Sequence, residues 1–314
     1  MSNPDGTAAD LKTRGPEGTG GSAQGTLSPL LPLPLPPPQT SRQQRVVKFK
    51  LFKLSYLKSI TIDRATQVRY LITMAQKSST WITSRGCRIT GSQVGAILNH
   101  NTYESASSVL QGKIWPTSFS NAYTEYGQMY EDVAVYKFME FMSTKGLPEV
   151  SSKSNTSKPS ATSAAGATGG PITGDNKLPP VSVPGIKFAK VQFVCPFKMP
   201  WTAFSPDGIL LINGILGLLE IKCPGKLKLT RHIMHAYYDQ IQWSMGIAGL
   251  EYTYFVMYTP WYTCIRKVLF NREYFYFMVM KAYQFFTKDL LVAQFYKDLG
   301  LLKQGQTQPS VILM

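Results

Sequence analysis

Residues 201–226, WTAFSPDGILLINGILGLLEIKCPGK, have the pattern of two β-strands joined by a tight turn. Asn213-Gly214 marks the turn, because a type I′ turn needs positive φ at both central positions and Asn-Gly adopts such angles readily. Counting outward from this turn predicts the pairs Ile212 with Ile215, Leu210 with Gly217, Asp207 with Glu220 and Ser205 with Lys222. The sequence therefore predicts both a hairpin and its register.

Four polar side chains of this hairpin are expected to share one face. Side chains alternate along a strand, so Glu220 and Lys222 lie on the same side, as do Ser205 and Asp207. Two carboxylates that face each other across a strand pair repel, and their Ile and Leu neighbours leave the site partly dehydrated. A divalent cation between them would relieve the repulsion, and oxygen ligands suit Mg²⁺ or Mn²⁺. The alternative is an ordinary hairpin whose charges face solvent.

A metal ion beside Lys222 would suit the hydrolysis of a phosphodiester. The metal lowers the pKa of bound water and polarises a phosphoryl oxygen. Lys222 could position the attacking water, help to deprotonate it and stabilise negative charge on the phosphate. The hairpin therefore predicts an enzyme, a metal-dependent phosphodiester hydrolase that uses one or two ions.

The charge of the chain indicates a polyanionic partner. Its 33 Lys and Arg exceed its 18 Asp and Glu by 15. Such an excess is typical of proteins that bind nucleic acid or an anionic membrane surface. The basic residues recur inside the part expected to fold, since eleven Lys or Arg and a single acid, Asp63, lie between Arg42 and Arg88. The alternative is a basic tail that only aids solubility.

Two low-complexity stretches divide the chain. Residues 1–44 contain the Pro-rich run SPLLPLPLPPP and are expected to be a disordered tail with a polyproline II segment. Residues 143–180 are rich in Ser, Thr and Gly, and we expect a flexible insertion rather than a linker between two domains. The prediction is one nuclease domain over 45–300, followed by a short tail over 301–314.

The remaining sequence is periodic and predicts an α/β (α+β) fold. Apolar spacing predicts helices at 46–80, 91–99, 104–114, 122–142, 232–249 and 272–298. Strand-like runs occur at 186–195, 200–210, 215–223, 252–258 and 263–269. This order predicts a central mixed β-sheet flanked by helices.

SPDG followed by LEIKCP resembles the core motif of PD-(D/E)xK nucleases, whose core is restriction-endonuclease-like. The residues of this motif are most similar to those of the lambda exonuclease and YqaJ-type viral recombinase family, which is alkaline exonuclease-like. Further motifs match in the same order along the chain. They are Trp81-x-x-x-Arg85, Ile89-Thr90-Gly91-Ser92, Gly127-x-x-x-Glu131-x-x-Ala134 and Ala236-Tyr237-x-x-Gln240-x-Gln242-x-x-Met245.

The resemblance implies roles for the matched residues. Metal ligands would be Asp207, Glu220, the Ile221 carbonyl and Glu131. Lys222 would position the water, and Gln240 would orient the site or contact the scissile strand. A DNA phosphate would be held by Arg85, Thr90, Ser92 and Ser205. Independently of the family, Thr90-Gly91-Ser92 begins an expected helix, where free amides favour anions.

The resemblance also implies an activity, which is exonuclease digestion of linear duplex DNA from 5′ ends in recombination, replication or repair. A structure-selective endonuclease and a catalytically inactive DNA-binding module are the alternatives. DNA is the expected partner. A single-strand annealing protein and a homo-oligomer follow only by analogy.

Other features concern compartment and further sites. The four cysteines have no C-x-x-C spacing, so we expect free thiols in a reducing compartment. With no secretory signal and no apolar run long enough for a bilayer, we expect a soluble intracellular protein, nuclear if eukaryotic or from a nuclear virus and otherwise cytoplasmic.

His232-x-x-His235 could be a pair of metal ligands, but exposure on a helix surface is favoured. The aromatic run 273–286 could stack on bases, but core or a subunit contact is favoured.

Overall fold

The computed structural model describes residues 41–74, 78–117, 122–145, 182–225 and 232–309. By its contacts the chain divides into two units, Met1–Thr40 and Ser41–Met314, and every described residue belongs to the second. The expected Pro-rich tail and the expected insertion fall almost wholly outside the described residues. No helix in the described ranges is both long enough and apolar enough to span a membrane.

The centre of the second unit is a five-stranded mixed sheet with the order β2-β4-β5-β6-β7. Its strands are β2 (Ile186–Ala189), β4 (Gly208–Ile212), β5 (Ile215–Lys222), β6 (Tyr252–Thr259) and β7 (Tyr262–Leu269). β5 and β6 pair in parallel, and the other neighbours pair antiparallel. A separate parallel pair joins β1 (Ile89–Thr90) to β3 (Thr202–Ala203).

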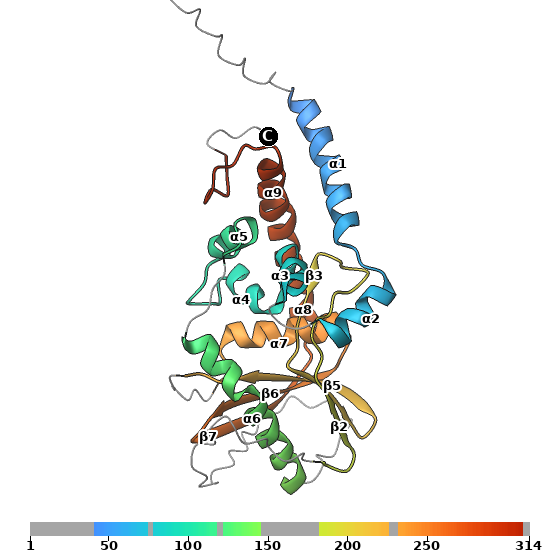
Figure 1. The fold of residues 1–314 in the computed structure, drawn as a ribbon, viewed down its shortest axis with the longest axis vertical. Helices are drawn as coiled ribbons and strands as arrows, with labels where there is room; N and C mark the ends of the chain where they lie inside the picture. Colours follow the sequence, from blue (N-terminus) through green and yellow to red (C-terminus); the bar gives the residue numbers. More distant parts are fainter. Residues whose placement is uncertain (1–40, 75–77, 118–121, 146–181, 226–231, 310–314) are drawn as a thin grey trace, which may run out of the picture. The chain divides into compact units, whose positions relative to one another are not determined.

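Helices flank this sheet and stand beside it (Figure 1). Before the sheet come α1 (Arg42–Ile60), α2 (Arg64–Thr73), α3 (Ser79–Gly86), α4 (Gly91–Ile97), α5 (Ala106–Ile114) and α6 (Ala122–Lys145). Later in the chain are α7 (His235–Ala248), α8 (Arg272–Phe285), the π-helical segment η1 (Phe286–Leu290) and α9 (Leu291–Asp298). The predicted fold class is confirmed, since a mixed sheet lies between helices.

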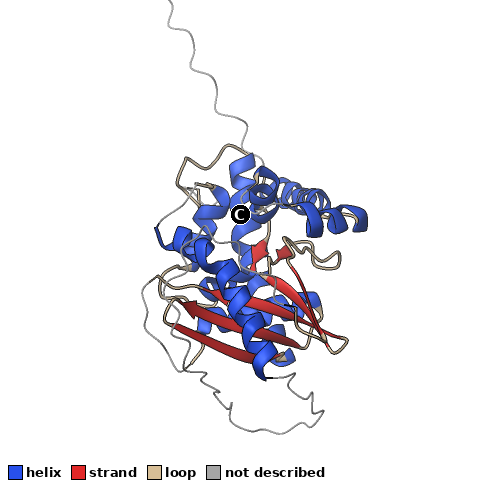
Figure 2. Cartoon of the chain, turned by 60° about the horizontal axis from the view of Figure 1, so that its bottom comes forward, coloured by secondary structure: helices blue, strands red, loops and turns tan. Residues whose placement is uncertain are grey.

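The helices α6 and α7 cover opposite faces of the sheet. Leu219, Ile221 and Val256 pack in one cluster with side chains of α6. Leu218 and Phe255 pack in another cluster with side chains of α7. Neighbouring strand residues point to opposite faces, so the two clusters are the two sides of one sheet. Figure 2 shows the strands enclosed by helices in this way.

Three expected elements are divided in the structure. The helical stretch 46–80 becomes α1, α2 and α3, because the Asp63 carboxylate accepts from the Thr66 amide at 2.7 Å and caps a new helix. The strand 200–210 is interrupted at Ser205-Pro206, since proline has no amide for a ladder. The long helix 272–298 contains η1.

Two further boundaries differ from the prediction. Of the expected strand 186–195 only β2 forms, and Val194 makes an isolated antiparallel bridge to Phe204. Part of the expected tail 301–314 packs on the domain, because Leu302 is buried and the Trp115 indole donates to the Gln306 carbonyl at 2.7 Å. The folded part of the chain thus extends past Gly300.

Candidate active site

The hairpin β4–β5 has the predicted register over its whole ladder. Ile212 pairs with Ile215 and Leu210 with Gly217. The turn residues Asn213 and Gly214 have φ angles of 50° and 81°, as a type I′ turn requires. The turn chemistry therefore sets the position of every side chain that follows on β5.

The last pair of the ladder is Gly208 with Leu219, so the pairing stops one residue short of Asp207 and Glu220. The predicted pairs Asp207 with Glu220 and Ser205 with Lys222 are therefore not ladder pairs, because the chain leaves the sheet at Ser205-Pro206. Asp207 is held in a different way. Its Oδ2 accepts from the Ile221 amide at 2.6 Å, which keeps its carboxylate against the end of β5.

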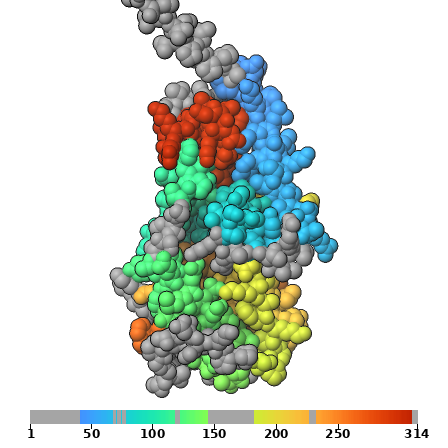
Figure 3. Space-filling model, in the orientation of Figure 1, coloured from blue at the N-terminus to red at the C-terminus, as the bar shows by residue number. Residues whose placement is uncertain are grey.

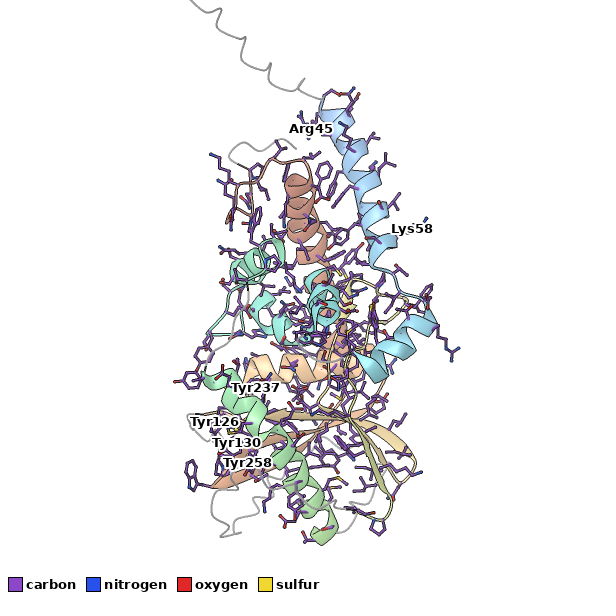
Figure 4. All side chains as sticks on the ribbon, viewed as in Figure 1. Arg45, Lys58, Tyr126, Tyr130, Tyr237 and Tyr258 are labelled. Atoms are coloured by element: carbon purple, nitrogen blue, oxygen red, sulfur yellow. The ribbon has the colours of Figure 1, made fainter. Side chains whose placement is uncertain are left out.

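Glu220 and Lys222 share a face of β5, as predicted. Lys222 Nζ lies 2.7 Å from Glu220 Oε1, and the Glu220 side chain is only 4% exposed. The Gln240 amide of α7 donates to the same Glu220 oxygen. Lys222 Nζ also lies 5.4 Å from the centre of the Tyr237 ring, again on α7. This part of the site is therefore built on the face of the sheet that α7 covers. Figure 4 labels Tyr237, which belongs to this helix.

The electrostatics of the site favour a bound cation. Burial, and then the charge of Glu220, raise the pKa of Asp207 well above its ordinary value, while Lys222 opposes the shift. Burial alone would lower the pKa of Lys222, but Glu220 and Asp207 raise it instead. Burial and the charge of Asp207 also raise the pKa of the Cys223 thiol to about 12. The site thus holds more buried negative charge than Lys222 neutralises.

Glu131 approaches from α6, on the other face of the sheet. It adds to the raised pKa of Asp207, so its carboxylate acts on that group. Glu131 Oε1 lies 3.0 Å from Lys190 Nζ, and the Glu131 side chain is 17% exposed. The surface of α6, coloured green, adjoins the yellow surface of the β2 and β4 region on the face drawn in Figure 3. Lys190 also pairs with Asp132, at 3.3 Å.

The predicted metal ligands come near one another without forming a closed cage. In the described part of the chain, no three Asp, Glu, His or Cys side chains are grouped closely enough to hold an ion by themselves. Glu220 faces Lys222 and Glu131 faces Lys190. Among the described residues the His232-x-x-His235 alternative gains no third ligand either. The ligand set of Asp207, Glu220, Glu131 and the Ile221 carbonyl stays a prediction.

A cavity of about 170 Å³ adjoins the carboxylates. Its lining residues are Trp81, Arg85, Gly91, Ser92, Phe204, Ser205, Gln240 and Ser244. Gln240 lines the cavity and also bonds to Glu220, so this one residue joins the cavity to the carboxylate site.

Among the described residues, Arg85 is the only charged side chain that lines this cavity. Its guanidinium lies 4.4 Å from the Trp81 ring centre and donates to Ser92 Oγ at 3.1 Å and to Thr90 Oγ1 at 3.3 Å. Burial lowers the pKa of Arg85 to about 10. Thr90 is fully buried and does not line the cavity, so it supports Arg85 from behind.

Two buried polar atoms that belong to residues lining this cavity have no hydrogen-bond partner among the described residues. They are the Trp81 indole nitrogen and the Ser205 hydroxyl oxygen. Leaving a buried donor unpaired costs free energy, so such atoms indicate a ligand. Both can donate, and both accompany a guanidinium, which together indicate an anion.

Some supporting residues were not predicted from the sequence. Trp81 was part of a motif but had no role, although its ring stacks on Arg85, and the i, i+4 spacing of the two residues could have indicated the contact. The others are Arg88 and Lys113, which are both buried near Arg85. Nothing in the local pattern of a lysine on a short helix distinguishes a buried one from an exposed one.

Comparison with known proteins gives a weak likeness in structure. No protein-family model matches the chain, and no curated protein sequence does. A solved structure of an alkaline exonuclease, LHK-Exo, from Laribacter hongkongensis is 16% identical, with a TM-score of 0.46 and coverage of 72% of this chain and 100% of that one. LHK-Exo in complex with dAMP gives the same identity and coverage and a TM-score of 0.48. At these values we argue function from the site itself.

Proposed function

We propose that the chain is a metal-dependent DNA exonuclease that digests linear duplex DNA from 5′-phosphorylated ends. One observation carries the proposal. Gln240 connects a buried carboxylate pair with its lysine to a cavity that holds a guanidinium and two unpaired donors. A phosphodiester bond one nucleotide away from a terminal phosphate needs both halves of such a site.

The carboxylates fit a divalent cation. Glu220 is buried and Asp207 is half-buried, and the raised pKa of Asp207 reflects the free-energy cost of ionising both carboxylates. A divalent ion would remove that cost, because it attracts both carboxylates. Asp207, Glu220, Glu131 and the Ile221 carbonyl would hold Mg²⁺ or Mn²⁺, as one or two ions. When bound, the metal would make the attacking water more acidic and polarise a phosphoryl oxygen.

Lys222 would act as a proton donor in hydrogen bonds rather than as a base. Its pKa is raised, so it keeps its proton at neutral and moderately alkaline pH. A charged ammonium next to Glu220 can orient the attacking water and stabilise negative charge that develops on the phosphate. The Gln240 amide fixes the Glu220 carboxylate that Lys222 also contacts.

The cavity would bind the 5′-terminal phosphate. Arg85 would provide a planar pair of donors, and Ser92, Ser205 and the Trp81 indole would complete the set. A terminal phosphate carries up to one more negative charge than an internal diester, so a cationic cavity favours it. The helix α4 has only seven residues, so these side chains, and not a helix dipole, carry the assignment.

The test is digestion of linear duplex DNA with 5′-phosphate or 5′-hydroxyl ends, in Mg²⁺ and in EDTA, with closed circular DNA as a third substrate. We expect cleavage only in Mg²⁺, faster release from the 5′-phosphate end, and no loss of circles. Equal rates on both ends with nicking of circles would replace the exonuclease with an endonuclease. Binding without cleavage in Mg²⁺ would replace both with a DNA-binding module.

A further inference from the structure

Two cations are buried behind Arg85. Lys113 is 8% exposed and Arg88 is 2% exposed. Lys113 Nζ donates to the main-chain carbonyl of Arg85 at 2.6 Å and to that of Arg88. Arg88 donates to the carbonyls of Ser84, at 2.7 Å, and Ile60. Within the described ranges, neither cation makes an ion pair with a carboxylate.

These contacts hold the end of α3. The last carbonyls of a helix have no partner within the helix, and a cation near them is favourable. Arg88 and Lys113 bind the carbonyls of Ser84 and Arg85, which belong to the last turn of α3. The Arg85 side chain leaves the same turn and enters the cavity, where it stacks on Trp81. Lys113, on α5, thus fixes the backbone position from which Arg85 reaches the cavity.

The same arrangement concentrates positive charge. Burial, and then the charge of Arg85, lower the pKa of Lys113 to about 7, with a smaller contribution from Arg88. Cys87 and Glu104 act in the opposite direction. Like charges that crowd together in a buried place are unfavourable unless an anion joins them. A doubly charged phosphate in the cavity would be that anion.

We propose that Lys113 is a positioning and specificity-determining residue, which fixes Arg85 through its main chain and supplies the charge that makes the cavity prefer a terminal phosphate. The inference rests on the proposed function, because it assumes that the cavity binds a DNA end. Lys113 does not line the cavity, so it acts on the phosphate through Arg85 and through its charge.

The first experiment replaces the charge and keeps the length, as Lys113→Met. The affinity of short duplexes with 5′-phosphate and 5′-hydroxyl ends is measured in Ca²⁺, and their ratio is the end preference. One unit charge acting over roughly 10 Å at an effective dielectric constant of about 20 changes a binding constant by about tenfold. We expect the ratio to fall about tenfold, with a smaller change in the affinity for the 5′-hydroxyl duplex.

Lys297→Met is the matched control. Lys297 also donates to a main-chain carbonyl, that of Ile114, at 2.6 Å, and it lies 4.5 Å from the Trp115 ring centre. It is not among the residues that line the cavity or that shift the pKa of Lys113. Its removal should leave the end preference unchanged, and any loss of stability common to both variants is monitored by thermal melting.

The second experiment uses the unaltered protein and varies the pH from 7 to 9. In the free protein Lys113 loses its proton above its pKa of about 7, and a bound phosphate dianion would raise that pKa. Above about pH 7, binding of the phosphate must therefore be accompanied by uptake of a proton, which weakens binding as the pH rises. Arg85 keeps its charge over most of this range, since its pKa is about 10. The end preference should therefore fall as the pH rises, and Lys113→Met or Lys113→Gln should flatten the dependence.

The outcomes separate the two ideas. An end preference that Lys113→Met keeps in full, or that is constant from pH 7 to 9 in the unaltered protein, overturns the role of Lys113 alone. An unaltered protein that binds both ends equally overturns the phosphate cavity, and the role of Lys113 with it. Cleavage in Mg²⁺ is not used as a readout, so an inactive protein still gives a result.

Discussion

The carboxylate site and the phosphate cavity differ in the sign of the charge that each leaves uncompensated. Around β5, Asp207 and Glu220 share one lysine, Lys222, and the pKa of Asp207 rises. Around the end of α3, Arg85 and Lys113 have no paired carboxylate among the described residues, and their pKa values fall. Each half of the site therefore departs from ordinary pKa values in the direction that an oppositely charged ligand would correct.

The difference indicates how the two halves would contribute to the proposed nuclease reaction. A metal ion would complete the acidic half and a phosphate the basic half, and a DNA end carries a phosphate next to the bond that the metal would activate. Gln240 donates a hydrogen bond to Glu220 and also lines the cavity. Removal of either half should thus give a different defect, in catalysis for the acidic half and in end preference for the basic half.

The largest effect is expected at the acidic half. Asp207→Ala or Glu220→Gln should lower cleavage by on the order of 10³-fold or more, because a metal ion contributes several kcal/mol to such a transition state. DNA affinity in Ca²⁺ should change little, since it comes mostly from basic contacts with phosphates. Gel assays of cleavage and fluorescence anisotropy measure the two quantities. Turnover of the Asp207→Ala protein at the rate of the unaltered one would refute the metal site.

The sequence predicted the acidic half better than the basic half, for a physical reason. Asn213-Gly214 needs a defined backbone geometry, and a hairpin then places every side chain by counting, so Glu220 and Lys222 fell on one face as expected. The prediction failed only beyond Gly208, where Pro206 ends the ladder and a main-chain amide holds Asp207 instead.

The basic half depends on contacts between segments far apart in the chain. Lys113 contacts carbonyls 25 and 28 residues earlier, and Arg88 reaches Cys195, 107 residues later. No periodicity or turn signal encodes such contacts. The resemblance to the exonuclease family placed Arg85, Ser92 and Ser205, which the structure does bring to one cavity. It gave no role to Trp81, Arg88 or Lys113, which support Arg85.

A second prediction separates Glu131 from its neighbour on α6. Both Glu131 and Asp132 pair with Lys190, but the Asp132 side chain is 82% exposed and Glu131 is 17% exposed. If Glu131 is a metal ligand, Glu131→Gln should lower cleavage by about 10²-fold or more and raise the Mg²⁺ concentration needed, while Asp132→Asn should do neither. Equal, small effects of both changes in a Mg²⁺ titration would assign Glu131 to the ion pair with Lys190 alone.

A third prediction concerns the basic half and is of intermediate size. Arg85→Ala should reduce the preference for 5′-phosphate over 5′-hydroxyl ends by about ten- to a hundredfold, since a charge-assisted hydrogen bond is worth roughly 1.5–3 kcal/mol. Cleavage of the 5′-hydroxyl substrate should change less. Initial rates on the two substrates give the ratio. A variant that slows both substrates equally would show that Arg85 supports the fold or general DNA affinity and not the terminal phosphate.

The smallest expected effect is a gain in stability at the acidic half. Burial and the charge of Glu220 raise the pKa of Asp207, so the folded protein holds a proton there that the unfolded chain has released. Without metal, stability should therefore fall as the pH rises from about 4 through the raised pKa. Asp207→Asn keeps an oxygen that can accept from the Ile221 amide but removes the charge. In EDTA at pH 8 its Tm should exceed that of the unaltered protein by about 2–4 °C, the shift that roughly 1 kcal/mol gives in a domain of this size.

Mg²⁺ should raise the Tm of the unaltered protein and leave that of the Asp207→Asn variant nearly unchanged. A variant that melts lower than the unaltered protein at both pH 5 and pH 8 in EDTA would show that the Asp207 carboxylate stabilises the metal-free fold, and would remove the electrostatic argument for a cation between the two carboxylates.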